Sequence, residues 1–380
     1  MTVFRKALSG ERDQLIDFGN YVFSHDHRPH DFKAILPKVY GDGHEIESFH
    51  FVAEEEGRIR GMIAAYPHTY NVAGNTLKTR FIGTVSVHPY TRGGGYMKKI
   101  MQMIDEEIAA DGTDYAALGG QRQRYRYFGY ELGGMALSFV VDTANLKHTV
   151  GPLDESISLV PVEAEDDALL DQLYAKYLTR PVTGRSREEF YEVLITWGSR
   201  IYAVFEDVTC VGYLVLSNDG KRVMETQLDD VSRLPDILNT YLNWYDQHAV
   251  TVVVRRYETA LIDVLTPMAE DVSIENNLSY KIYNYPKVLK AFLELKQQHE
   301  VLEDGSFVLE ISGKAKMRIE IFQGKVAVTE TEDPADWVLA DTEAVRYLTS
   351  PEPLFRSVLP ACVPGSWFPL SFGMSPLEEF

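Results

Sequence analysis

The hydrophobic pattern in the first third of the chain changes from strand-like runs to one helical run. Between Phe49 and Val87, apolar runs are separated by two turn-forming segments, EEEG and AGN, and this predicts consecutive antiparallel strands. The last run ends at Pro89. Farther on, MKKIMQMIDEEIAADG has apolar residues at helical spacing and stops at Gly112. A strand over residues 113–120 and the strand-like text MALSFVVDT complete the predicted mixed sheet.

The same pattern begins again at about Gly151. The segment IYAVFEDVTCVGYLVLSN repeats the order of FVAEEEGRIRGMIAAYPH, with a strand, an acidic turn and a second strand that contains a glycine, Gly212 and Gly61 respectively. Where the first copy continues into a glycine-rich loop, the second reads DDVSRLPDILNTYLNWY. We interpret the second copy as a degenerate duplicate that keeps the fold and has lost the loop.

A third region starts near Pro286. It has a helical segment, KVLKAFLELKQQ, then three strand-like runs and a proline-rich tail that ends in SPLEEF. At 380 residues the chain is also long enough for two or three domains. The predicted fold class is therefore α+β, with mixed-sheet domains at 1–150 and 151–285 and a smaller α/β domain at 286–380.

Composition and charge narrow the classes of function. With 45% hydrophobic and 24% charged residues the chain is typical of soluble globular proteins. No stretch is apolar enough to span a bilayer, so we expect no membrane partner and a cytoplasmic location. A net charge of −19 argues against nucleic acid as a partner and favours a cationic substrate, although acidity that serves only solubility is an alternative. Cys210 and Cys362 lie in apolar segments and are predicted to be buried, inert thiols.

Residues Thr91–Ile100, TRGGGYMKKI, carry the first sign of chemistry. Three consecutive glycines, Gly93, Gly94 and Gly95, are costly to order, which implies a structural need. They precede a predicted helix, and the N–H groups of a helix start bind anions. Arg92 adds a permanent cation. We therefore expect a phosphate site. The GK[ST] ending of a nucleotide-binding Walker loop is missing, and the competing interpretation is a glycine hairpin with no function.

These residues together resemble the GNAT superfamily of N-acetyltransferases. The resemblance rests on the strand TVSVHP, the RGGG loop, the amphipathic helix, and Tyr125 four residues before the pair Gly129–Tyr130. In that superfamily the loop Arg/Gln-x-x-Gly-x-Gly/Ala binds the pyrophosphate of coenzyme A. Arg92 and Gly95 match this pattern, whereas Met97 replaces the final small residue.

In this respect the loop resembles that of one branch, the enhanced intracellular survival proteins, whose loop ends in a larger apolar residue. The three-part layout is also similar to that branch, which has a working acetyltransferase domain, a degenerate copy and a domain similar to sterol carrier proteins. The resemblance implies acetyl-coenzyme A as co-substrate, no metal, and a homo-oligomer, with hexamers expected for this branch.

The resemblance also implies a set of cofactor-binding residues. The backbone of Val85, Ser86 and Val87 would pair with the pantetheine arm as an added strand does, while a splay in the sheet leaves an N–H for the thioester oxygen. The expected set is Val85, Ser86, Val87, Arg92, Gly93, Gly94, Gly95, Tyr96, Met97, Lys98, Gly120 and Gln121.

Two catalytic groups follow from the resemblance. Tyr125 would protonate the departing thiolate; the alternative is that it is a packing residue, as Tyr127 and Tyr130 could equally be. Phe380 would supply its α-carboxylate as base. A carboxyl pKa of about 3.5 lies roughly 7 units below that of an alkylamine, so this role needs desolvation or a relaying water. The alternative for Phe380 is an ordinary frayed terminus.

The expected acceptor site contains Asp26, Glu379 and Phe23, in places where the resembled branch has residues that face a polyamine or aminoglycoside. The histidines of FSHDHRPHDF do not have the spacing of a common zinc site, and no metal is expected there.

The sequence therefore predicts an N-acetyltransferase that moves an acetyl group from acetyl-coenzyme A to a primary amine of a cationic acceptor, such as an aminoglycoside, a polyamine or a lysine. Two alternatives stay open. One is a protein that binds an apolar ligand and has a vestigial acetyltransferase fold, and the other is a different acyl or aminoacyl transferase.

Overall fold

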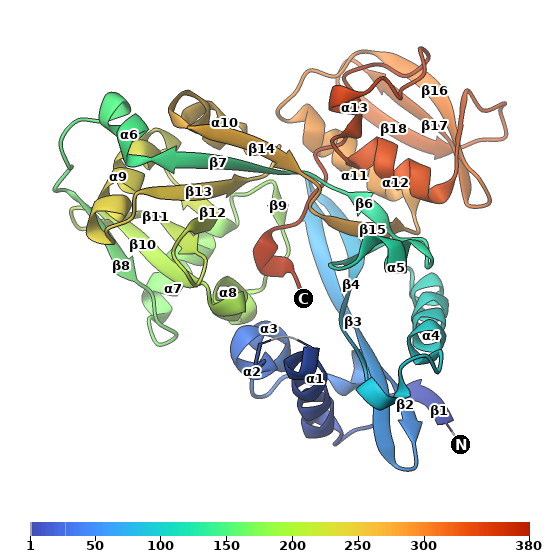
Figure 1. The fold of residues 1–380 in the computed structure, drawn as a ribbon. Coiled ribbons are helices and arrows are strands. Elements are labelled where there is room, and N and C mark those ends of the chain that lie inside the picture. The colour runs from blue at the N-terminus through green and yellow to red at the C-terminus, as the bar shows by residue number, and fades with distance from the viewer. Residues whose placement is uncertain (1, 27) are drawn as a thin grey trace. The chain divides into compact units, whose positions relative to one another are not determined.

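The computed structural model describes residues 2–26 and 28–380, without the side chain of Asp26. Contacts divide the chain into two compact units. The first unit comprises Met1–Gly133, Leu278–Leu370 and Glu379–Phe380, and the second comprises Gly134–Asn277 and Ser371–Glu378. Each unit combines segments that are far apart in the sequence, as the colour ramp of Figure 1 shows.

The main sheet of the first unit has the strand order β1-β2-β3-β4-β5-β15-β6. Its strands are β1 (Thr2–Lys6), β2 (His50–Glu55), β3 (Arg58–Val72), β4 (Asn75–Val87), β5 (Tyr115–Leu118), β15 (Leu278–Ile282) and β6 (Glu131–Gly133). Its helices are α1 (Arg12–Asp26), α2 (Phe32–Ile35), α3 (Pro37–Tyr40), α4 (Tyr96–Asp111) and α5 (Arg122–Arg126). The strands β1 to β4 pair in antiparallel fashion, and β4 pairs with β5 in parallel across the crossover helix α4. The sheet is therefore mixed.

A second, smaller sheet in the first unit has the order β18-β17-β16-β19. The elements of this region are α11 (Tyr285–Gln297), β16 (Gly305–Ile311), β17 (Ala315–Phe322), β18 (Lys325–Glu330), β19 (Trp337–Leu339), α12 (Asp341–Thr349) and α13 (Glu352–Phe355). The helix and the three strands predicted after Pro286 are thus confirmed.

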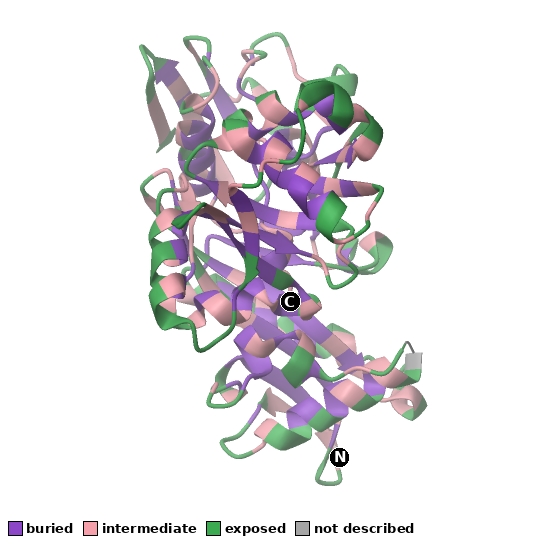
Figure 2. Cartoon of the chain, turned by 90° about the vertical axis from the view of Figure 1, so that its left-hand side faces the viewer, coloured by how far each residue is buried: buried purple, intermediate pink, exposed green. Residues whose placement is uncertain are grey.

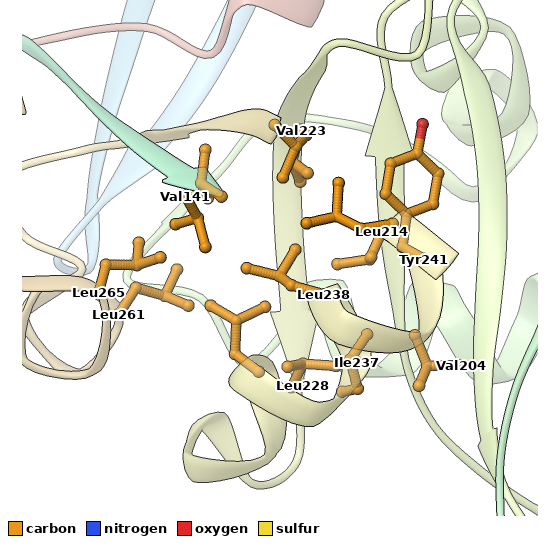
Figure 3. Packing of buried hydrophobic residues seen from close by; sticks show 14 of the residues in the cluster. Val141, Val204, Leu214, Val223, Leu228, Ile237, Leu238, Tyr241, Leu261 and Leu265 are labelled. Atoms are coloured by element: carbon orange, nitrogen blue, oxygen red, sulfur yellow. The ribbon is translucent and has the colours of Figure 1, made fainter. Parts of the chain in front are cut away.

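The second unit is built on a mixed sheet with the order β14-β7-β13-β12-β11-β10-β8. Its elements are β7 (Ala136–Asp142), α6 (Thr143–Thr149), β8 (Ile157–Pro161), α7 (Asp167–Tyr177), β9 (Val182–Thr183), α8 (Arg187–Leu194), β10 (Arg200–Glu206), β11 (Thr209–Leu216), β12 (Arg222–Leu228), α9 (Leu234–Trp244), β13 (Ala249–Val254), α10 (Thr259–Leu265) and β14 (Asp271–Glu275). Residues of α9 and α10 pack on the strands around Leu214 and Val223 (Figure 3). Figure 2 shows the strands of both units mostly buried and many helix faces exposed.

The two main sheets share a detail that supports the predicted duplication. In the β2–β3 hairpin the register shifts between Ala53 and Glu54, opposite Gly61. In the β10–β11 hairpin the register shifts between Val204 and Phe205, opposite Gly212. A bulge at the same place in both copies explains why each second strand carries a glycine there. The α+β class with tandem mixed-sheet domains is confirmed.

One strand assignment was wrong. The text MALSFVVDT was predicted to complete the first sheet, but it forms β7, which pairs with β13 and β14 in the second unit. The place in the first sheet is taken by β15, which lies between β5 and β6. Both strands are apolar and antiparallel to their neighbours, so the periodicity of either segment fits either sheet. The contact pattern groups non-consecutive segments into two units. The division of the chain into three consecutive domains stays a prediction.

The two cysteines differ in their environment. Cys210 is buried, as predicted, but Cys362 is exposed, which corrects the prediction for that residue. Cys362 follows the last helix in a stretch of turns, where nearby apolar letters do not imply a core position. Within residues 2–26 and 28–380, no helix is long and apolar enough to cross a membrane.

Candidate active site

The site begins where the pairing of β4 with β5 ends. Their parallel pairing runs from Thr79↔Tyr115 to Ile82↔Leu118, and β4 continues beyond it to Val87. Just past that point the β3–β4 register shifts, and Thr84 takes the left-handed conformation with φ 44°. Such a bulge bends its strand and re-aims the residues beside it. The backbone of Gly83–Val87 therefore lies beyond the pairing with β5, which ends at Leu118, and the predicted splay of the sheet stays a prediction.

The glycine loop leads directly into α4. Gly93 and Gly95 have φ values of 87° and 77°, which side chains rarely tolerate, and an added Cβ at either residue would meet nothing within 4 Å. The need for glycine at these two positions therefore comes from the backbone conformation. Gly95 is the N-cap of α4 and makes no side-chain cap, so the first N–H groups of this 16-residue helix are available to an anion.

Tyr125 lies on α5 and packs against Gly120. The Tyr125 residue is 6% exposed, and a Cβ added to Gly120 would lie 2.6 Å from its ring. Burial raises the pKa of Tyr125, while the positive charge of Arg124 and a hydrogen bond to it oppose that rise. The phenol is therefore protonated at neutral pH, as a proton donor requires.

The last residue of the chain is packed in the first unit. The ring of Phe380 stacks on Tyr40 at 6.0 Å, is tilted to Tyr66 at 5.7 Å and meets Phe81 edge-on at 6.3 Å. Its Cδ1 occupies the space beside Gly83, where an added Cβ would lie 2.2 Å from it. The alternative of a frayed terminus does not describe this ring.

A cavity of about 900 Å³ joins these parts in the first unit. Its wall consists of Val22, Phe23, Ile82, Gly83, Thr84, Val85, Val87, Thr91, Arg92, Gly93, Gly94, Gly95, Tyr96, Met97, Lys98, Gly119, Gly120, Gln121, Arg124, Tyr125, Tyr127, Phe128 and Phe380. The loop, the helix start, the tyrosine and the terminal residue therefore share one space, although they are distant in sequence.

The charges around this cavity suit phosphates. Among the described side chains of its wall, the charged ones are the cations Arg92, Lys98 and Arg124, and the ammonium of Lys98 lies 5.2 Å from the ring centre of Tyr127. Glycines that leave open space beside the loop allow a diphosphate to approach the backbone. These residues fit the phosphorylated arm of coenzyme A.

Two of the predicted residues with described side chains, Ser86 and Glu379, are not part of the cavity wall. Ser86 is fully buried, because it points to the other side of β4 from Val85 and Val87. Glu379 contributes its backbone carbonyl to a contact with Lys38, and the side chain of Asp26 lies outside the described residues. Phe23, the third acceptor residue predicted, does line the cavity and packs edge-on against Phe32 at 5.1 Å.

Sequence reasoning missed Gly83, Thr84 and Lys38. A signal for Gly83 existed, since an isolated glycine inside the strand FIGTVSV marks a bulge or a close approach. The buried lysine gave no comparable signal, because the letters around it, LPKVY, do not show which way the side chain points.

Comparison with known families decides the identity of this region. The family model for the acetyltransferase (GNAT) domain matches residues 3–133. Residues 3–133 are a GNAT acetyltransferase domain. The GNAT domain contains the glycine loop, α4 and Tyr125. No curated protein matches the chain.

Solved structures extend the likeness to the whole chain. A GCN5-related N-acetyltransferase from Anabaena variabilis is 18% identical, with 100% of both chains covered and a TM-score of 0.69. Eis1 from Mycobacterium abscessus is 16% identical, with 100% of both chains covered and a TM-score of 0.65. A conserved protein of unknown function from Enterococcus faecalis, described as a probable N-acyltransferase, is 15% identical over 90% of this chain and 88% of its own, with a TM-score of 0.64. At these identities the likeness shows a shared fold. The fold of the chain is thus similar to that of Eis1 and of the GCN5-related N-acetyltransferase from Anabaena variabilis.

Proposed function

We propose that this protein is an N-acetyltransferase that transfers the acetyl group of acetyl-coenzyme A to a primary amine of a cationic acceptor. The observation that carries the proposal is the single cavity shared by the glycine loop, Tyr125 and Phe380. Acetyl-coenzyme A supplies the thioester. The acceptor classes that fit are aminoglycosides, polyamines and lysine side chains, and the net charge of −19 attracts all three.

The loop holds the co-substrate in this proposal. N–H groups at the start of α4 and the guanidinium of Arg92 bind the diphosphate. The backbone of β4 at Val85 and Val87, beyond its pairing with β5, hydrogen-bonds the amide-rich arm as a neighbouring strand would. These contacts orient the thioester carbon for direct attack and account for part of the rate by positioning.

Two groups then move protons. The amine nitrogen forms its bond to the acyl carbon as the carbon–sulfur bond breaks. The α-carboxylate of Phe380 accepts a proton from the nitrogen, which becomes acidic as it attacks, and the Tyr125 hydroxyl donates a proton to the departing sulfur. Burial of the tyrosine keeps that proton in place until the thiolate forms.

The remaining features of the proposal follow from the resemblance to the enhanced intracellular survival proteins that the sequence suggests. We propose that the region after Pro286 is similar to sterol carrier proteins, and that the chain assembles as a homo-oligomer, with a hexamer expected. Size-exclusion chromatography with light scattering tests the assembly.

The deciding experiment is release of free thiol from acetyl-coenzyme A against a panel of polyamines, aminoglycosides and lysine peptides. We expect release that depends on an amine, and a fall in kcat on the order of 10²-fold in Tyr125→Phe, with coenzyme A affinity measured by calorimetry unchanged. Calorimetric binding without thiol release would point to another acyl group. The absence of both coenzyme A binding and thiol release would favour a protein that binds an apolar ligand and has a vestigial acetyltransferase fold.

A further inference from the structure

Lys38 is a buried lysine whose side chain reaches the end of the chain. The residue is 3% exposed and belongs to the short helix α3. Its Nζ donates a hydrogen bond to the backbone carbonyl oxygen of Glu379, at 2.9 Å. The two residues are separated by 341 positions in the sequence, and both belong to the first unit.

Such a contact needs a reason. Lysines are rarely fully buried, because removing an ammonium from water is costly unless hydrogen bonds and charges compensate. Chain ends are usually frayed unless something holds them. Here the buried ammonium of Lys38 contacts a chain end that would otherwise be mobile. The contact is therefore best explained by a need to hold the end of the chain in place.

The same helix holds the terminal residue in a second way. Tyr40, two residues after Lys38, stacks its ring on Phe380. The Tyr40 hydroxyl and Oγ1 of Thr84 are hydrogen-bonded at 3.0 Å, beside the bulge of β4. Helix α3 therefore contacts the last two residues at a backbone carbonyl and at an aromatic ring, and it ties that contact to the wall of the cavity.

We propose that Lys38 is a positioning residue that holds Glu379 and thereby keeps Phe380 in the wall of the cavity. This inference rests on the proposed role of the Phe380 carboxylate. Consecutive Cα atoms are about 3.8 Å apart, so an ammonium bonded to the Glu379 carbonyl also lies near the terminal carboxylate. Lys38 thus restrains the tail by a directional hydrogen bond and by attraction of opposite charges.

The first test measures the tail without measuring catalysis. A carboxypeptidase that prefers C-terminal aromatic residues releases Phe380 only when the tail has left its site. We expect Lys38→Met, which keeps an unbranched apolar stem and loses the donor, to speed phenylalanine release by about 10-fold or more. A ten-fold ratio corresponds to about 1.4 kcal/mol, close to the contribution of a hydrogen bond from a charged donor.

A matched control is available in the same unit. Lys296 is 1% exposed, and its Nζ donates to the carbonyl oxygen of Pro369, also at 2.9 Å. Lys296→Met therefore removes a buried lysine and a lysine–carbonyl bond, as Lys38→Met does, but away from the last two residues. We expect it to lower the melting temperature and to leave the rate of phenylalanine release close to that of wild type.

The second test asks whether Lys38 acts through the tail. We expect Lys38→Met to lower kcat by about 10-fold to 100-fold, as misplacement of a reacting group does, and to change the KM for acetyl-coenzyme A by less than about 3-fold. In a chain that lacks residues 379–380, the same substitution should have almost no further effect on kcat. Lys296→Met should lower the melting temperature of the shortened chain as much as it lowers that of the full chain.

The outcomes separate the two proposals. Faster release of Phe380 with unchanged turnover would keep the positioning role and remove the terminal carboxylate from the mechanism. Unchanged release in a folded Lys38→Met protein would overturn the positioning role, whatever the activity. Additive effects of the substitution and the deletion on kcat would overturn it as well.

Discussion

The ring of Phe380 packs directly against the backbone of Gly83 and leaves no room for a side chain there. Gly83 has an ordinary φ, so alanine is acceptable to the backbone, but its Cβ would lie 2.2 Å from Cδ1 of Phe380. We expect Gly83→Ala to push the terminal ring out and to lower turnover on the order of 10²-fold, while calorimetry shows coenzyme A affinity within about 3-fold of wild type.

Gly119→Ala is the comparison for that variant. It adds the same methyl group to the same cavity wall, but its Cβ would lie 3.8 Å from Leu278, an ordinary contact. Its turnover should fall much less. Equal losses in the two variants would mean that any added volume in the cavity is harmful, and the terminal ring would then have no special place.

His50 gives the first unit a dependence on pH. It is fully buried beside Tyr40, with Nδ1 at 2.7 Å from the carbonyl oxygen of Ile46. Burial lowers the pKa of His50 to about 4 from its ordinary 6.5, although the carbonyl and nearby glutamates oppose the shift. Between these values the unfolded chain binds a proton that the folded chain does not. The stability contributed by the neutral histidine is therefore complete above pH 6.5 and is lost as the pH falls toward 4.

Denaturant unfolding at several pH values tests this. The free energy of unfolding should fall by up to about 1.4 kcal/mol per pH unit from His50 within that window. His50→Gln should remove this part of the slope, whereas His148→Gln, at an exposed position on α6, should leave it in place. An unchanged slope in His50→Gln would assign the acid sensitivity to other groups.

At the scale of elements, the junction of loop and α4 depends on left-handed glycines. Gly95 precedes the helix with φ 77°, so Gly95→Ala places a side chain in a strained conformation and turns the first N–H groups away from a bound anion. We expect coenzyme A affinity by calorimetry to fall about 10-fold or more. Gly74→Ala, in the β3–β4 hairpin with φ 86°, carries the same strain away from the cavity and should cost stability alone. Equal affinity in both variants would show that the helix start does not bind the diphosphate.

Much of this element was predictable, and the limits are physical. The glycine run, the helical period and the stop at Gly112 predicted α4 to within a residue, because each signal is local. The strand assignment of MALSFVVDT failed, because an alternating apolar strand carries no information about which sheet it joins. Lys38 and Thr84 were missed for a related reason. Their importance comes from neighbours that are distant in sequence, which are Glu379 for Lys38 and Tyr40 for Thr84.

At the scale of the whole molecule, the C-terminal tail has two different attachments. Within the second unit, Leu377 is fully buried in a core cluster, and Glu378 accepts from Nε of the buried Arg185 at 2.7 Å. Arg185 also makes two hydrogen bonds to Glu225, both at 2.8 Å. Only Glu379 and Phe380 belong to the first unit. The tail therefore combines an anchoring part with a terminal part proposed to act in catalysis.

Two truncations separate these parts. Removing residues 379–380 should abolish most turnover and lower the melting temperature of the first unit, because buried Lys38 loses its acceptor and the Phe380 ring leaves its aromatic neighbours. Removing residues 376–380 should in addition destabilise the second unit by about 2–5 kcal/mol, because Leu377 leaves a cavity and Arg185 loses one of its carboxylate partners. Full activity in the shorter truncation would exclude the terminal carboxylate as base. Equal melting temperatures for both would show that the anchor contributes nothing to folding.

The place of β15 between β5 and β6 bears on how the protein is made. Residues 3–133 carry the matched GNAT domain, yet one strand of their sheet, Leu278–Ile282, follows residues 134–277 of the second unit in the chain. While the ribosome is still translating Gly134–Asn277, β5 has an open edge, and unpaired edges recruit other strands. The nascent first unit is thus exposed to aggregation until residue 282 emerges. A gene fragment cut at the boundary of the family match should yield inclusion bodies unless the missing strand is supplied.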